Sequence, residues 1–280
     1  MSDTVPLAAP ATRVHVLVGL VLFAAGLTTL LVGRVAVSAF VAVVVLAAYI
    51  DLRRLLAPWG HIVTVALGAF GVGGFLWSGY SGRLDLLASA GAALVLALFV
   101  TRVLLFEVHA RSSSGTTFDI ASTLGAAGVA GVLGAHVLLI RSTDRFGFRG
   151  LLAFGLMVIA NDVASFVVER LRGSRRRPPA TSRTKSWAGA AAGFIASVIV
   201  GVVAGVVLDP PFDLRSGAVL GIAMGVLVPL GELAFAAIKR SAGVRMSGTY
   251  LGPMGGALDA VDGLLFAAPA FYWALRTLAL

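Results

Sequence analysis

Apolar runs long enough to cross a lipid bilayer recur along the whole chain. Runs of about 20 mostly apolar residues, which a helix needs to cross the hydrocarbon core, occur near residues 14–32, 35–50, 61–79, 84–106, 118–140, 150–169, 188–208, 215–238 and 263–280. Only 12% of the residues are charged and the mean hydropathy is +0.97, far from the values of a water-soluble domain. Because lipid cannot pair backbone N–H and C=O groups, the spans must be helices. The sequence therefore predicts an all-α, polytopic membrane protein with about nine transmembrane helices.

The distribution of Lys and Arg predicts the orientation in the membrane. Nine spans place the two termini on opposite sides, and most of the 22 Lys and Arg residues fall on the inner side if the N-terminus is cytoplasmic. Positive loops tend to stay in the cytoplasm, so we expect a multi-pass protein of the cell (inner) membrane with a cytoplasmic N-terminus. The net charge of +9 then fits contact with anionic membrane lipids. No basic groove with interleaved aromatic residues is visible, so we expect no nucleic-acid partner.

Two of the spans carry glycines at regular intervals. They occur every three residues at Gly125, Gly128, Gly131 and Gly134, and every four residues at Gly217, Gly221 and Gly225. Small residues at such spacing let helix backbones approach closely. We expect these faces to pack against neighbouring helices, and the same faces would also suit a homodimer.

One stretch, residues 239–262, gathers charge between two apolar spans. It holds three cations, two carboxylates and a glycine cluster: Lys239, Arg240, Arg245, Asp259, Asp262, Gly252, Gly255 and Gly256. Cations neutralise phosphate oxygens, and glycines let backbone N–H groups approach them. The two Asp residues, three apart, share one helical face, where they can hold a hard divalent ion. The stretch predicts a phosphate-and-metal site at the membrane surface.

Two further acids lie inside apolar spans. Asp162 follows Asn161 in the sixth span, and Glu232 interrupts the eighth. A carboxylate within a membrane is costly, which favours a functional role over simple packing. The chain has no Cys and its four His residues are scattered, so hard oxygen donors are the available ligands. We therefore predict a site for Mg²⁺, or another divalent cation, built from Asp162, Glu232, Asp259 and Asp262.

Residues 239–262 also resemble the C-terminal signature of the CTP:phosphatidate cytidylyltransferase (CDP-diacylglycerol synthase) family. The family's K-R, second Lys, G-G and two terminal aspartates correspond, with the spacing kept, to Lys239-Arg240, Arg245, Gly255-Gly256, Asp259 and Asp262. Three earlier blocks, at residues 161–173, 182–189 and 231–240, resemble the same family in the same order. These blocks contain Asp162, Lys185 and Glu232. In the first half of the chain the likeness extends only to hydrophobicity.

The resemblance implies an enzyme of phospholipid biosynthesis. Such a nucleotidyltransferase would transfer a cytidylyl group from CTP to phosphatidate, giving CDP-diacylglycerol and pyrophosphate. The implied catalytic residues are Asp259, Asp262, Lys239 and Arg240, and the implied substrate-binding residues are Lys185, Arg245, Gly255 and Gly256. The glycine turn would present N–H groups at the start of the last helix. We expect residues 1–149 to form a scaffold of transmembrane helices and residues 150–280 to form the catalytic region.

Departures from the family pattern leave a second hypothesis open. Apolar residues replace polar ones at Met246, Met254, Ala260 and Ala188. A metal site that lacks a ligand loses affinity, so the chain would then be a catalytically degenerate member that acts as a lipid- or partner-binding membrane protein. The surviving charged residues favour the enzyme, because unpaired charges at a bilayer surface are costly without a ligand.

Overall fold

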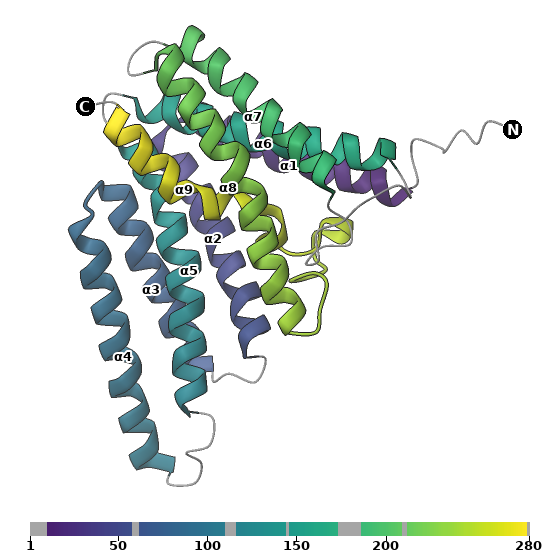
Figure 1. Ribbon diagram of the computed structural model, residues 1–280. Coiled ribbons are helices and arrows are strands. Elements are labelled where there is room, and N and C mark those ends of the chain that lie inside the picture. The colour runs from purple at the N-terminus through teal and green to yellow at the C-terminus, as the bar shows by residue number, and fades with distance from the viewer. Residues whose placement is uncertain are drawn as a thin grey trace, which may run out of the picture.

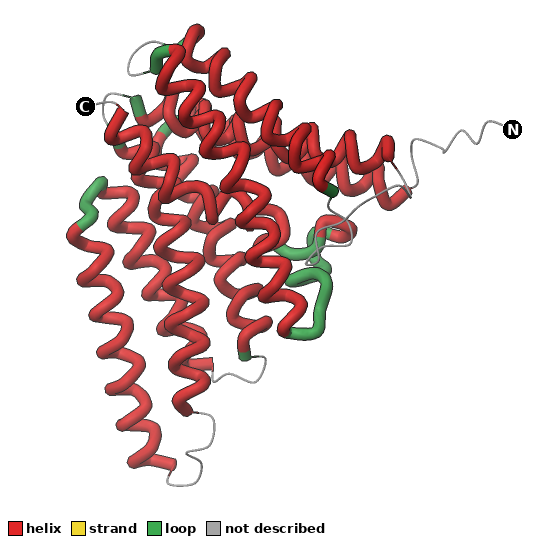
Figure 2. The backbone as a smooth tube through the Cα atoms, in the orientation of Figure 1, coloured by secondary structure: helices red, strands yellow, loops and turns green. Residues whose placement is uncertain are grey.

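Long hydrophobic helices and short connections make up nearly all of the structure. The computed structural model describes residues 10–57, 62–109, 116–143, 146–172, 186–208 and 212–278. Within these ranges the chain forms nine α-helices and one short 3-10 helix, and no strand occurs (Figure 2). The elements are α1 (Pro10–Val32), α2 (Arg34–Leu56), α3 (Ile62–Ser81), α4 (Asp85–His109), α5 (Thr116–Ser142), α6 (Gly147–Arg172), α7 (Trp187–Val207), α8 (Leu214–Ser241), η2 (Gly252–Met254) and α9 (Ala257–Leu278). The predicted all-α fold is confirmed.

The lengths and hydropathies of the helices identify a multi-pass membrane protein. Among the described residues, seven helices are long and apolar enough to span a bilayer, namely α2, α3 and α5 to α9. The other two, α1 and α4, contain shorter apolar runs at Val16–Val32 and Asp85–Thr101. Nine helices agree with the predicted count of about nine.

Two helices extend beyond their predicted spans. The second continues past residue 50 to Leu56, and the last begins at Ala257 rather than near residue 263. The predicted spans excluded these extra turns because the turns carry charged residues. These are Asp51 and Arg53 on α2, and Asp259 and Asp262 on α9. Partners from other elements bind these side chains: Asp51 accepts hydrogen bonds, and Arg53, Asp259 and Asp262 form ion pairs.

Helix α9 connects the two halves of the chain. In Figure 1, α3, α4 and α5 run side by side, whereas α6 and α7 cross the upper part of the molecule at a steep angle. Helix α9 packs against α8 and α6, and also against α2 and α5 from the first half. Two hydrophobic clusters fill the interior, and both include residues of α2, α5, α8 and α9. The core is therefore continuous across the predicted boundary near residue 149.

Helices α7 and α8 touch through their glycines. A Cβ atom on Gly217 would lie 2.2 Å from the carbonyl oxygen of Gly201, and one on Gly221 would lie 2.7 Å from that of Ser197. The predicted close packing of this face is confirmed. Because α7 of the same chain covers the face, a homodimer would need other surfaces.

Candidate active site

The last turns of α8 bring Lys239 into the interior. Lys239 is 8% exposed, and its ammonium group lies 2.6 Å from Oδ1 of Asp259 and 3.3 Å from Oδ2 of Asp262. The two Asp residues are three apart on α9, so both carboxylates face α8. We call these three residues the Lys239 cluster. Breaking a buried ion pair by removing one partner costs about 3–5 kcal/mol, so the cluster fixes the end of α8 against the start of α9.

Asp259 also organises the connection between α8 and α9. Its Oδ2 accepts hydrogen bonds from the backbone N–H of Ser247 at 2.7 Å, the Ser247 hydroxyl at 2.9 Å and the N–H of Gly256 at 2.9 Å. Because α9 begins at Ala257, Asp259 is its third residue and bonds back to the residue before the helix, as acids at this position commonly do. Oδ1 of Asp259 thus binds Lys239, and Oδ2 holds the loop between α8 and α9.

Carboxylates crowd the paired glycines of the signature. A Cβ atom on Gly255, whose φ is +96°, would lie 2.2 Å from Oδ2 of Asp259, and one on Gly256 would lie 2.2 Å from Oδ2 of Asp51. Only glycine fits at either position. The N–H of Gly255 donates to the Gly252 carbonyl at 3.1 Å, and that of Gly256 donates to Asp259. Both N–H groups thus bind the protein's own oxygens, and their contact with phosphate stays a prediction.

Asp51 is a carboxylate of this region that sequence reasoning missed. It lies on α2 and is 1% exposed. Its Oδ2 accepts hydrogen bonds from the Ser247 hydroxyl at 3.2 Å, the Tyr250 hydroxyl at 2.8 Å and the Leu258 N–H at 3.1 Å. The predicted span stopped at residue 50, so Asp51 looked like a residue at the end of a helix. The sequence signal that could have identified Asp51 was its position directly after a long apolar run, where a carboxylate is costly.

Tyr250 completes this second set of contacts. Its hydroxyl donates to Asp51 and accepts a hydrogen bond from the N–H of Ala257 at 2.6 Å. Burial of the hydroxyl, together with its hydrogen bond to the Asp51 carboxylate, raises the pKa of Tyr250 to about 12. Tyr250 therefore stays protonated at neutral pH and donates to Asp51.

Glu232 approaches the cluster from α8. A Cβ atom on Gly263, the residue after Asp262, would lie 3.3 Å from Cγ of Glu232. The carboxylates of Glu232 and Asp262 are close enough for their charges to interact. Like charges this close repel each other, which favours a cation between or beside them.

The other predicted metal ligand from a membrane span is Asp162. It is on α6 with an exposed side chain, whereas its neighbour Asn161 is buried and donates to the Ser197 hydroxyl on α7 at 3.1 Å. In the described part of the chain, no three His, Cys, Asp or Glu side chains are placed to hold one metal ion. The described residues do not show the predicted four carboxylates around one ion, and Lys239 lies between Asp259 and Asp262. Metal binding stays a prediction.

Arg240 and Arg245 are exposed beside the cluster. They line a cavity of about 400 Å³ with Gly243 and Val244. The chain turns away from α8 here, since the N–H of Gly243 donates to the Arg240 carbonyl at 2.9 Å and Gly243 has a φ of +75°. Guanidinium groups bind phosphate oxygens well, so this cavity can accept an anion. The third predicted phosphate-binding cation, Lys185, lies outside the described residues.

Two of the departures from the family pattern have different surroundings. Met254, on η2, packs against α1: its Cε lies 3.4 Å from the position of a Cβ atom on Gly19. This contact with an apolar helix suits a methionine. Met246 is 45% exposed in the loop. Neither side chain belongs to the Lys239 cluster.

The fold and the site together define a multi-pass membrane protein with a carboxylate-rich site beside exposed arginines. The model of the Cytidylyltransferase family matches residues 12–278, so the chain belongs to this family.

Similar proteins share parts of the sequence. The uncharacterized protein YnbB of Escherichia coli is 32% identical over 143 residues, 51% of this chain and 48% of that protein. The phosphatidate cytidylyltransferase of Brucella suis is 29% identical over 143 residues, 51% of this chain and 53% of that protein. The chain thus matches about half the length of these relatives. The phosphatidate cytidylyltransferase of Mycobacterium bovis is 28% identical over 270 residues, 93% of this chain and 85% of that protein.

Proposed function

We propose that this chain transfers a cytidylyl group from CTP to phosphatidate, giving CDP-diacylglycerol and pyrophosphate. The observation that carries the proposal is the convergence of the signature's carboxylates on buried Lys239, beside exposed Arg240 and Arg245. Membership of the cytidylyltransferase family supports the reaction type. The names of the relatives from Brucella suis and Mycobacterium bovis support phosphatidate as the acceptor.

The reaction exchanges one phosphorus–oxygen bond for another. A phosphate oxygen of phosphatidate attacks the α-phosphorus of CTP, and the bond from that phosphorus to the bridging oxygen breaks to release pyrophosphate. Catalysis of such a transfer consists mainly of positioning and charge neutralisation. In this proposal Arg240 and Arg245, which line the cavity, bind the triphosphate. Lys239 fixes the orientation of Asp259 and Asp262, and Asp51 fixes the loop that joins them to α8.

The carboxylates suit a hard divalent cation such as Mg²⁺, which prefers oxygen ligands. Asp259, Asp262 and Glu232 are the candidate ligands. Because no three such side chains are placed for one ion among the described residues, binding would require Lys239 to move away from Asp259 and Asp262. When bound, the ion would offset the charge on the triphosphate and on the departing pyrophosphate.

A direct assay tests the proposal. Purified protein in detergent, supplied with CTP, phosphatidate and Mg²⁺, should release pyrophosphate and form CDP-diacylglycerol. Inactivity over a range of divalent metals, with activity gained in the double variant Met246→Asp/Met254→His, would instead identify a degenerate family member. Inactivity of both proteins in a folded state would overturn the proposed reaction.

We also propose that the protein lies in the cell (inner) membrane with its N-terminus and residues 239–262 facing the cytoplasm. The excess of Lys and Arg on that side supports this orientation. The chain has no Cys, so single cysteines can be labelled cleanly. Ser241→Cys should react from the cytoplasmic side and Arg83→Cys from the other side. Labelling of both from one side would contradict the orientation.

A further inference from the structure

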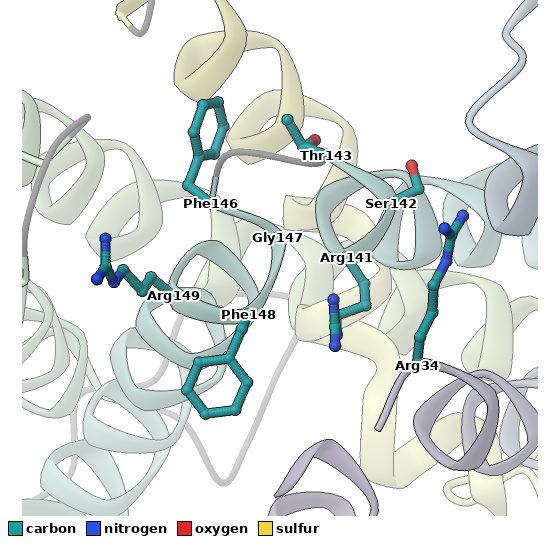
Figure 3. Close-up of a pocket in the computed structure, with 8 residues that line it drawn as sticks. All are labelled: Arg34, Arg141, Ser142, Thr143, Phe146, Gly147, Phe148 and Arg149. Carbon is teal, nitrogen blue, oxygen red and sulfur yellow. The ribbon is translucent and has the colours of Figure 1, made fainter. Parts of the chain in front are cut away.

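A second charged recess lies at the end of the molecule opposite the Lys239 cluster. Its cavity of about 240 Å³ is formed where α5 ends, α6 begins and α2 begins (Figure 3). Arg34 is the first residue of α2, whereas Asp51 lies near the other end of that helix, roughly 25 Å further along. The recess is therefore separate from the proposed active site.

Three arginines line this recess. Figure 3 shows Arg34 and Arg141 on one side of Gly147 and Arg149 on the other. Arg34 and Arg141 are close enough for their charges to repel each other. The described lining residues include no carboxylate. The guanidinium groups of Arg34 and Arg141, close together in a recess at the end of membrane helices, attract an anion.

Arg34 and Arg141 differ in how their donors are used. The Arg34 guanidinium donates to the Tyr80 carbonyl and lies over the Tyr80 ring, 4.8 Å from its centroid. This contact fixes its direction. The Nε of Arg141 is buried and has no hydrogen-bond partner in the described part of the chain. A buried donor without an acceptor is costly, so its presence points to an acceptor supplied by a ligand.

The size and position of the recess restrict the ligand. Its volume is below the roughly 300–1,000 Å³ typical of sites for drug-sized molecules, so it suits a single phosphate group better than a nucleotide. The first turns of α2 and α6 add the positive ends of two helix dipoles. Phe148, 37% exposed, provides an apolar surface beside the charges. Basic pockets between transmembrane helices bind anionic headgroups in this way.

We propose that the recess bounded by Arg34, Arg141 and Arg149 binds the phosphate group of an anionic phospholipid at the membrane face opposite the Lys239 cluster. The lipid phosphate would bridge the starts of α2 and α6 and accept a hydrogen bond from Nε of Arg141. A ligand that binds only the folded state raises its stability, so this lipid would stabilise the junction of α2, α5 and α6.

Lipid retention tests the proposal. Full-length protein would be equilibrated with mixed phosphatidylglycerol and phosphatidylcholine, and native mass spectrometry would measure the lipid retained. Phosphatidylglycerol is the probe because the proposed reaction does not consume it. Wild type should prefer phosphatidylglycerol. Arg141→Gln should weaken that preference at least about tenfold, since it removes a charge-assisted hydrogen bond, and Arg34→Gln should weaken it independently.

The matched control is Arg215→Gln, which removes one exposed charge near the start of α8, outside the recess. It should retain phosphatidylglycerol as wild type does. Equal retention of both lipids by wild type, or unchanged retention in both folded recess variants, would overturn the proposal. So would an equal loss in the control. Competition with inorganic phosphate separates the two sources of phosphate: persistence of the bound lipid supports a lipid site, and complete displacement at equal concentration overturns it.

Discussion

Two buried ion clusters in this molecule differ in charge balance. In the first half of the chain, Arg53 on α2 pairs with Asp119 on α5. Arg53 also donates to the Thr123 hydroxyl at 2.9 Å and to the Ala57 carbonyl at 2.7 Å, and Thr64 donates to Asp119 at 2.9 Å. One cation faces one anion here, and both are enclosed by hydrogen bonds.

The Lys239 cluster has a different balance. One ammonium group faces two carboxylates, with Glu232 close to Asp262. The Arg53–Asp119 pair holds α2 to α5, which is a structural role. In the second, Lys239 faces two carboxylates beside a cavity with two exposed arginines. The comparison teaches that burial of an ion pair does not by itself identify a functional site, whereas a buried cation that faces two carboxylates beside a cavity favours one.

The largest expected effect is on catalysis. Asp259→Asn removes a negative charge and a ligand type that Mg²⁺ prefers, while keeping the side chain's shape. We expect pyrophosphate release to fall at least about 10³-fold, on the order of 4 kcal/mol in the barrier. Circular dichroism and thermal unfolding should show that the variant remains folded. A rate within tenfold of wild type would remove Asp259 from the proposed mechanism.

The Arg53–Asp119 pair should respond in stability instead. Arg53→Met leaves Asp119 buried without its cation, which should lower the free energy of unfolding by about 3–5 kcal/mol. Denaturant unfolding in detergent measures this loss. The double variant Arg53→Met/Asp119→Leu should recover most of it, and the turnover of the folded protein should stay near that of wild type. A double variant as unstable as the single one would contradict a purely pairwise role.

Substitution of Asp51 should have an intermediate effect on both stability and catalytic rate. Asp51→Asn weakens the contacts to Ser247, Tyr250 and Leu258 without emptying the site, so we expect a loss of about 1–2 kcal/mol in stability. Looser positioning of the loop should lower kcat roughly tenfold. Asp85→Asn is the matched control, because Asp85 forms an exposed pair with Arg83 at 2.6 Å. Equal kcat values for both variants would show that Asp51 does not position the site.

The smallest expected effect depends on pH. The pKa of Tyr250 is raised from 10.0 to about 12, so the folded state favours the protonated hydroxyl. Its contribution to stability is complete below pH 10 and is lost as the pH rises through 12. The difference in unfolding temperature between wild type and Tyr250→Phe should therefore shrink over that interval. A difference that stays constant from pH 9 to 12 would contradict the raised pKa.

Local patterns in the sequence predicted much of this molecule. Apolar length predicted the helices, and the spacing of the signature predicted that Lys239, Asp259 and Asp262 act together. Sequence did not predict that Lys239 would be buried, because its partners come from the next helix rather than from a neighbour on α8. It also missed Asp51, whose partners lie about 200 residues further along the chain. Contacts between distant segments leave no periodic pattern.

The contact between α7 and α8 has a mechanical consequence. At Gly201 and Gly217 no side chain separates the two backbones. Helix α8 is therefore held tightly against α7 there, and the rest of its length, which includes Pro229, forms an arm. Lys239 lies on that arm roughly 33 Å along α8 from Gly217. A small tilt of the arm against α9 would therefore move the ammonium group by a much larger distance than it moves the glycines. A tilt of α8 about its contact with α7 would thus be amplified at the Lys239 cluster.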